Sequence, residues 1–117
     1  MNTFKSKGVV ITGAASGIGE ALARNLAAQG ARLLLADVDT GRLDAVVAEL
    51  RAGGADCLAQ PCDVADVAAV QALADTALQA WGGADVLINN AGVGLVAPVH
   101  SLDLADAHWL IGQIQAV

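Results

Sequence analysis

Three short apolar runs without polar interruptions recur along the chain, at residues 9–11, 33–36 and 86–88. Such runs are typical of strands that are buried on both faces, as in a parallel sheet, because no position has to face water. A weaker run at residues 55–60 predicts one more strand. The pattern therefore predicts four strands.

Between these runs, apolar residues recur at helical spacing. The intervals of three and four residues are those of a helix that packs one apolar stripe against a sheet. The apolar positions are Ile18, Leu22 and Leu26 in the first segment, Leu43, Val46, Val47 and Leu50 in the second, and Val67, Val70, Ala74, Ala77 and Trp81 in the third. We therefore expect a helix in each gap between strands.

Glycines and capping residues mark the helix boundaries. Glycine is common just after a helix, and a side chain that accepts a backbone hydrogen bond is common just before one. The glycines are Gly30, Gly53, Gly54, Gly82 and Gly83, and the caps are Asp39 or Thr40, Asp66 and Asp103. Asp103 predicts a fourth helix, which follows a loop that contains Gly94 and Pro98.

The alternation of strands and helices predicts an α/β fold with right-handed crossovers. We expect the first half of a Rossmann-like, doubly wound parallel sheet with strand order 3-2-1-4. The cofactor crevice of such a fold lies at the carboxyl ends of the strands, here near the first and fourth. The fourth strand would be left as a bare edge, and no charge at its centre would discourage pairing with another chain.

The composition indicates one domain with more apolar side chains than it can easily hide. The 117 residues are 56% hydrophobic and 15% charged, whereas about 25% charged residues is typical of soluble domains. We interpret residues 1–117 as a single, apparently truncated domain. Its excess apolar surface favours self-association or packing against a missing C-terminal half.

The same composition argues against several kinds of partner. The net charge is −6 and the cations are scattered, so nucleic-acid binding is not expected. No segment reaches the roughly 18 unbroken apolar residues of a membrane span, and no signal peptide stands apart from the first strand. We expect a cytoplasmic protein without membrane contact, in which Cys57 and Cys62 are free buried thiols.

The stretch between the first strand and the first helix carries the clearest candidate chemistry. Gly13, Gly17 and Gly19 have the spacing G-x-x-x-G-x-G. A helix N-terminus presents unpaired backbone N–H groups and a favourable dipole, and glycines let an anion come close. The arrangement predicts a dinucleotide pyrophosphate site, with a purely structural glycine turn as the alternative.

Asp37 ends the second predicted strand, where a carboxylate can accept hydrogen bonds from ribose hydroxyls. The next residues are Val38 and Asp39, so no arginine follows to neutralise a 2′-phosphate, and NAD is favoured over NADP. Asp39 or Thr40 suits the cap of the following helix better, which leaves Asp37 free for a ligand.

Two more polar motifs close the third and fourth strands. Asp63 and Val64 either contact an adenine or form a turn with a core valine, and both interpretations stay open. Residues 89–92, with the sequence Asn-Asn-Ala-Gly, either let a ligand pass close to the backbone or form a turn stabilised by asparagine side chains.

These motifs together, in this order and spacing, resemble the N-terminal half of the classical short-chain dehydrogenases/reductases, over essentially the whole chain. The resemblance implies that the glycine stretch lies along the pyrophosphate, that Asp37 holds the adenosine ribose, that Asp63 and Val64 flank the adenine, and that residues 90–92 line the cleft floor. The expected cofactor-binding residues are Gly13, Ser16, Gly17, Ile18, Gly19, Asp37, Val38, Asp63, Val64, Asn90, Ala91 and Gly92.

The catalytic set that the resemblance implies is not found. The family uses a serine and a Tyr-x-x-x-Lys pair, in which the lysine lowers the pKa of the tyrosine. This chain has no tyrosine, and its only lysines are Lys5 and Lys7. In place of the asparagine of the family's fourth helix it has Ile114 or Gln115. We therefore expect no catalytic residue and no metal ligand here.

The leading hypothesis is the dinucleotide-binding portion of a short-chain oxidoreductase, whose full-length parent transfers hydride between NAD and an alcohol or ketone. The chain alone is expected to bind the cofactor weakly and to catalyse nothing. The alternatives are a non-catalytic dinucleotide-binding or protein-interaction module, and a truncated product without function.

Overall fold

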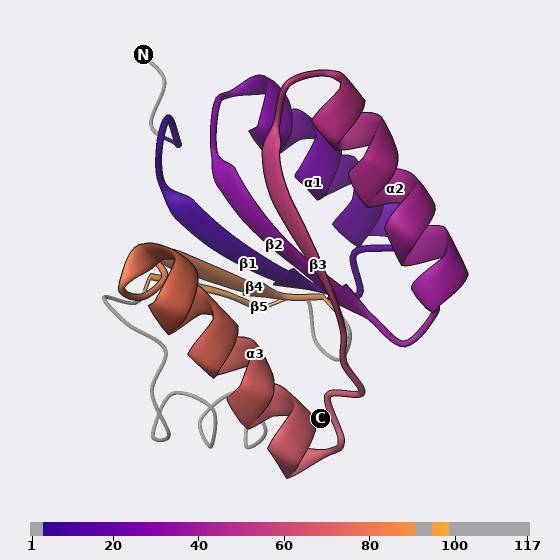
Figure 1. Cartoon of the computed structure of the whole chain (residues 1–117), viewed down its shortest axis with the longest axis vertical. Helices are drawn as coiled ribbons and strands as arrows, with labels where there is room; N and C mark the ends of the chain where they lie inside the picture. The colour runs from indigo at the N-terminus through magenta and orange to yellow at the C-terminus, as the bar shows by residue number, and fades with distance from the viewer. Residues whose placement is uncertain (1–3, 91–94, 99–117) are drawn as a thin grey trace.

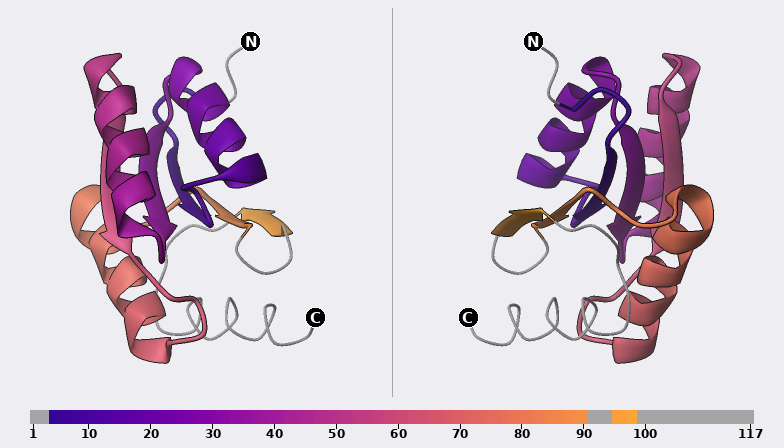
Figure 2. Two further views of the ribbon diagram at one scale, coloured as in Figure 1. Left: turned by 90° about the vertical axis from the view of Figure 1, so that its right-hand side faces the viewer. Right: turned by 90° about the vertical axis from the view of Figure 1, so that its left-hand side faces the viewer.

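Alternating strands and helices build one twisted sheet with helices on both faces (Figures 1 and 2). The computed structural model describes residues 4–90 and 95–98. Within them the elements in chain order are β1 (Gly8–Thr12), α1 (Gly17–Ala28), β2 (Arg32–Asp37), α2 (Thr40–Ala52), β3 (Asp56–Pro61), α3 (Val67–Trp81), β4 (Val86–Asn89) and β5 (Leu95–Pro98).

The sheet order is β3-β2-β1-β4-β5, which confirms the predicted order 3-2-1-4 for the first four strands. These four strands are parallel, and Thr12 in β1 is paired with Ala36 in β2 and with Asn89 in β4. The carboxyl ends of the central strands therefore meet at one edge of the sheet.

The fifth strand corrects two expectations. Residues Leu95–Pro98, expected within a loop, pair antiparallel with β4, so that Leu95 lies opposite Asn89. The edge of β4 is therefore not bare. An unpaired strand edge presents backbone N–H and C=O groups that need hydrogen-bond partners. Strand β5 supplies these partners to β4.

Helices α1 and α2 cover one face of the sheet, and α3 covers the other (Figure 1). Successive strand residues alternate between the two cores: Val9 and Ile11 belong to the cluster under α1 and α2, and Val10 belongs to the cluster under α3. All three are fully buried. The double coverage explains why the strands read as uninterrupted apolar runs.

Most of the apolar helix positions that were predicted to face the sheet are buried, but two of them are exposed. Leu43, Val46, Val47 and Leu50 of α2 all lie in the core, whereas Ile18 is 70% exposed and Val67 is 44% exposed. Both exposed residues stand in the first turn of a helix, at the carboxyl end of the sheet. The expectation that Ile18 and Val67 face the sheet was therefore wrong.

The predicted boundaries of α1, α2 and α3 are confirmed. Asp39, rather than Thr40, is the N-cap of α2 and accepts a hydrogen bond from the Arg42 N–H at 3.1 Å. Asp66 caps α3 in the same way through the Ala68 N–H at 3.0 Å. Gly82 ends α3 with a φ of +75°, a conformation that suits glycine. No helix among the described residues is long and apolar enough to cross a membrane.

Trp81, at the end of α3, packs across the start of β1. Gly8 exchanges backbone and side-chain hydrogen bonds with Asp85, both at 2.8 Å, and this pairing holds β1 beside the start of β4. The Arg32 guanidinium lies 5.6 Å from the centre of the Trp81 ring. A side chain at Gly8 would place its Cβ 2.6 Å from Trp81 Cε3.

We predict that Gly8→Ala destabilises the chain by about 1–3 kcal/mol, because the ring must move out of a packed site. The measurement is urea unfolding followed by tryptophan fluorescence. Gly53→Ala is the matched control, since a Cβ there meets only ordinary contacts, the nearest at 3.5 Å. An equal loss of stability in both variants would contradict the packing explanation.

Candidate functional site

A pocket of about 550 Å³ lies at the carboxyl ends of the strands, and its lining comes from the segments that follow β1, β2, β3 and β4. The lining residues are Gly13, Ser16, Gly17, Ile18, Asp37, Val38, Cys62, Asp63, Val64 and Asn90. Nine of these ten belong to the cofactor-binding set expected from the sequence, and the tenth is Cys62. The fold thus brings together residues from four separate motifs.

The other residues that the sequence predicts for this site do not line the described pocket. Gly19, although expected to bind cofactor, is buried and does not line the pocket. Several predicted features lie outside the described residues: they are Ala91 and Gly92, the fourth helix expected from Asp103, and the choice between Ile114 and Gln115.

The turn from β1 into α1 places unpaired backbone donors at this pocket. Ser16 is the N-cap residue of α1, and its side chain makes no capping hydrogen bond. No described residue accepts a hydrogen bond from the N–H groups of Ser16, Gly17, Ile18 or Gly19. Gly13 and Gly17 have φ values of +66° and +60°, which favour glycine. The start of α1 can therefore receive an anion without displacing a protein partner.

Gly19 allows α1 to begin directly against the end of β1. A Cβ at Gly19 would lie 2.8 Å from Asn90 Nδ2 and closer still to the backbone carbonyl oxygen of Gly13. A backbone atom cannot swing aside as a flexible side chain can. Gly19 therefore sets the position of the helix N-terminus relative to the pocket, rather than lining the pocket itself.

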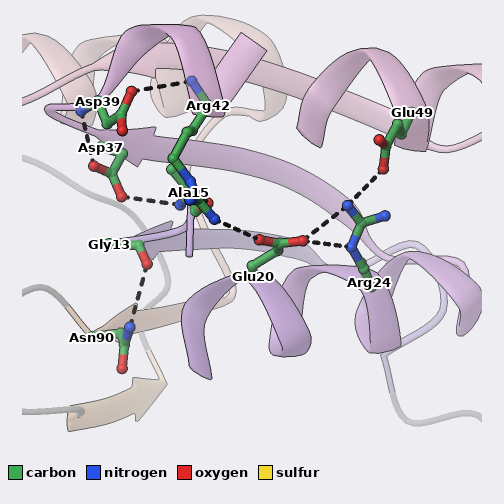
Figure 3. A network of polar contacts seen from close by, with 9 residues as sticks. All are labelled: Gly13, Ala15, Glu20, Arg24, Asp37, Asp39, Arg42, Glu49 and Asn90. Atoms are coloured by element: carbon green, nitrogen blue, oxygen red, sulfur yellow. Dashed lines mark hydrogen bonds and ion pairs between the residues drawn. The ribbon is translucent and has the colours of Figure 1, made fainter. Parts of the chain in front are cut away.

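Asp37 joins the glycine turn to the end of β2. Its Oδ2 accepts a hydrogen bond from the Ala15 N–H at 3.0 Å, and its Oδ1 accepts one from the Asp39 N–H at 3.0 Å (Figure 3). Asp39 caps α2, as expected, so Asp37 does not serve as the helix cap, although it is tied to the turn by these two hydrogen bonds. A carboxylate has about four acceptor positions, so two remain for a ligand in the pocket.

Asp63 forms the turn that one interpretation predicted, while the contact of Asp63 and Val64 with an adenine stays a prediction. Asp63 follows β3 and forms a turn in which its Oδ1 accepts a hydrogen bond from the Ala65 N–H at 3.0 Å. It also lines the pocket, together with Val64, which is half-buried against the core under α3. The turn fixes the position of the carboxylate at the pocket wall.

Two asparagines end β4 and serve different purposes. Asn90 lines the pocket and its Nδ2 donates to the Gly13 carbonyl at 3.3 Å, which ties the fourth strand to the glycine turn. Asn89 is fully buried, and its Oδ1 accepts a hydrogen bond from Thr12 Oγ1 at 2.8 Å. Asn89 Nδ2 has no hydrogen-bond partner among the described residues.

Sequence reasoning missed Arg42, which reaches the turn from the first turn of α2. Its Nε donates to the Ala15 carbonyl at 3.2 Å, and its guanidinium lies 3.7 Å from Glu20 (Figure 3). Arg42 is far from Ala15 in sequence, and only the parallel pairing of β1 with β2 brings the start of α2 beside the glycine turn. The contact between Arg42 and Ala15 could have been predicted only from this pairing of β1 with β2.

The two cysteines are free and buried, as predicted, and they belong to opposite cores. Burial is the main cause that raises the pKa of each thiol from 9.0 to about 11, for both Cys57 and Cys62. Cys62 borders the pocket, but a thiol with this pKa is protonated and unreactive at neutral pH. Among the described residues, no group of three or more His, Cys, Asp or Glu side chains is placed to hold a metal ion.

The raised pKa values of the two thiols predict that the folded chain loses stability at high pH. Because the pKa of each thiol is higher in the folded chain, the folded state retains protons that the unfolded state has lost. We expect the contribution of the two thiols to the free energy of unfolding to be constant below pH about 9 and to decrease as the pH rises toward about 11. Urea unfolding across this range measures it. Cys62→Ala should weaken the pH dependence, and an unchanged curve in that variant would contradict the assignment.

Comparisons with known proteins agree with this geometry. The family model for short chain dehydrogenases matches residues 7–112. A 1-deoxy-11-beta-hydroxypentalenate dehydrogenase from Streptomyces avermitilis is 50% identical over 101 residues, which cover 85% of this chain and 37% of that protein. The chain therefore spans well under half the length of this relative.

Solved structures show the same fold with either cofactor. A short chain dehydrogenase/reductase from Burkholderia phymatum, in complex with NAD, is 49% identical with a TM-score of 0.71, over 74% of this chain and 31% of that one. An actinorhodin polyketide ketoreductase variant with NADPH is 36% identical with a TM-score of 0.71, over 80% of this chain and 36% of that one. This chain belongs to the short chain dehydrogenase family.

Proposed function

We propose that the pocket binds NAD(H), and that this chain forms the dinucleotide-binding part of an oxidoreductase that moves hydride between NAD and an alcohol or ketone. The observation that carries the proposal is the convergence of two groups in one pocket. The unpaired N–H groups at the start of α1 suit a pyrophosphate, and the Asp37 carboxylate suits ribose hydroxyls.

The proposal assigns each part of the cofactor to a segment of the pocket. The pyrophosphate lies at residues 16–18, the adenosine ribose lies on the two remaining acceptor positions of Asp37, and the adenine lies between Val38 and the Asp63–Val64 segment. Asn90 contributes to the floor of the pocket. The bound nicotinamide supplies the hydride chemistry, and these residues hold and orient the dinucleotide.

The charge around Asp37 supports NAD rather than NADP. A 2′-phosphate on the adenosine ribose would stand beside this carboxylate, and like charges at close range repel. Arg42, a cation that contacts the same turn, does not line the pocket and already contacts the Ala15 carbonyl oxygen and Glu20. Both cofactors occur among the structural relatives, so the preference is a property that this chain's own residues must determine.

We also propose that this chain binds the cofactor without turning it over. Proton transfer to the substrate oxygen needs an acid such as the tyrosine phenol of the resembled family, and the 117 residues contain no tyrosine. A dinucleotide in this pocket meets donors and acceptors but no such group. We therefore expect an experiment on this chain to detect cofactor binding without hydride transfer.

The test is a fluorescence titration of the chain with NADH and, separately, with NADPH. We expect saturable NADH binding that is at least about tenfold tighter than NADPH binding, which corresponds to about 1.4 kcal/mol of charge repulsion. No saturable NADH binding would contradict the proposed function. Tighter binding of NADPH would contradict the cofactor preference alone.

A further inference from the structure

We propose that Arg42 is a positioning residue that aims the Ser16 N–H into the pocket by holding the Ala15 carbonyl from the opposite side. The inference rests on the proposed function and deepens it, because it names the side chain that prepares the anion-binding turn. Arg42 itself does not line the pocket.

The peptide group between Ala15 and Ser16 joins the contact with Arg42 to the pocket. None of the peptide bonds within residues 4–90 is cis, and in a trans peptide the C=O and N–H groups point in opposite directions. Arg42 Nε holds the Ala15 oxygen at 3.2 Å. The N–H of Ser16 therefore points away from Arg42, and Ser16 itself borders the pocket.

The neighbouring peptide groups of the turn are held by other anchors. The Gly13 carbonyl accepts from Asn90, the Ala14 N–H donates to the Ala36 carbonyl at 3.1 Å, and the Ala15 N–H donates to Asp37. These anchors come from the ends of β2 and β4, whereas Arg42 comes from α2. Removing the Arg42 side chain should therefore release the Ala15–Ser16 peptide and leave the rest of the turn in place.

Charge adds to this effect. Glu20, in the first turn of α1, places a negative charge near the proposed pyrophosphate position. Arg42 lies 3.7 Å from Glu20 Oε1, and Arg24 pairs with Glu20 Oε2 at 2.9 Å and with Glu49 at 2.6 Å (Figure 3). Arg42 is the member of this ion network that also contacts the turn. It offsets the Glu20 charge where an anion would approach.

The experiment is an NMR titration of the chain with ADP and with adenosine, because ADP carries the anion and adenosine does not. In the wild type we expect the Ser16 amide resonance to move with ADP. In Arg42→Ala we expect ADP to bind about three- to tenfold more weakly, the loss of about one hydrogen bond to a charged group, with adenosine binding unchanged. Arg42→Lys should recover part of the loss, because it keeps the charge.

The matched control is Arg51→Ala, which removes a cation from the other end of α2, where Arg51 Nε donates to the Cys57 carbonyl at 2.7 Å. It should leave ADP binding unchanged. Unchanged ADP binding in Arg42→Ala, or equal weakening of ADP and adenosine, would overturn the inference while the proposed function stands. A wild-type chain that binds neither ligand would overturn the proposed function itself.

Discussion

Gly19→Ala is expected to abolish measurable dinucleotide binding and to lower the stability of the chain by at least about 2 kcal/mol. The added Cβ would overlap the Gly13 carbonyl oxygen and crowd Asn90 Nδ2, so the start of α1 must move away from the end of β1. That movement displaces the helix N-terminus on which the proposed pyrophosphate site depends. NADH titration and thermal unfolding measure the two effects, and the melting temperature should fall by roughly 8 °C or more.

Gly41→Ala is the control for this variant. Gly41 lies in α2, where a Cβ would meet only Asp39 Oδ1 at 3.9 Å. Alanine has the higher helix propensity, so this variant should gain up to about 1 kcal/mol of stability and bind NADH normally. If Gly19→Ala folded and bound NADH as well as Gly41→Ala does, the close contact between α1 and the turn would not matter for the site.

The second large effect is expected at Asp37. Asp37→Ala should weaken NADH binding at least about tenfold, because it removes the proposed ribose acceptor and leaves the Ala15 N–H without its partner. Asp37→Asn should also weaken NADH binding. Because this substitution removes the negative charge, the ratio of NADPH affinity to NADH affinity should be higher in the variant than in the wild type. Parallel titrations of both cofactors with each variant measure the two ratios.

Asp44→Ala is the matched control for charge, since Asp44 lies on the exposed face of α2. It should leave both affinities unchanged. An unchanged ratio of NADPH to NADH affinity in Asp37→Asn would show that the carboxylate charge does not select the cofactor. Equal NADH binding in Asp37→Ala and Asp44→Ala would remove Asp37 from the proposed site.

The central elements of the fold were predictable because their patterns are local. Strands buried on both faces read as apolar runs, and capping residues such as Asp39 and Asp66 act within one turn of chain. The pairing of Leu95–Pro98 with β4 was not predicted, because a four-residue strand next to glycine and proline reads as a loop. Its formation follows from the unpaired edge of β4, which is a tertiary property.

The candidate site was predictable to the extent that each motif ends a strand. Parallel strands bring their carboxyl ends to one edge, so Gly13, Asp37, Asp63 and Asn90 meet there. The contacts among them were not predictable. That Asp37 holds the Ala15 N–H depends on how α1 and α2 sit against the sheet, as does the reach of Arg42 to the same turn. Sequence identifies the residues, and packing determines their hydrogen bonds.

The most direct test of the central claim is to map the NADH-binding residues on the wild-type chain by amide NMR. The largest shifts should fall at the start of α1, at residues 16–19, and at Val38 and Val64 of the pocket. A second cavity of about 410 Å³, bordered by Gly30, Gly53 and Gly54, should show no response. Shifts concentrated at that second cavity, or no saturable shifts at residues 16–19, would contradict the claim that the glycine turn forms a dinucleotide site.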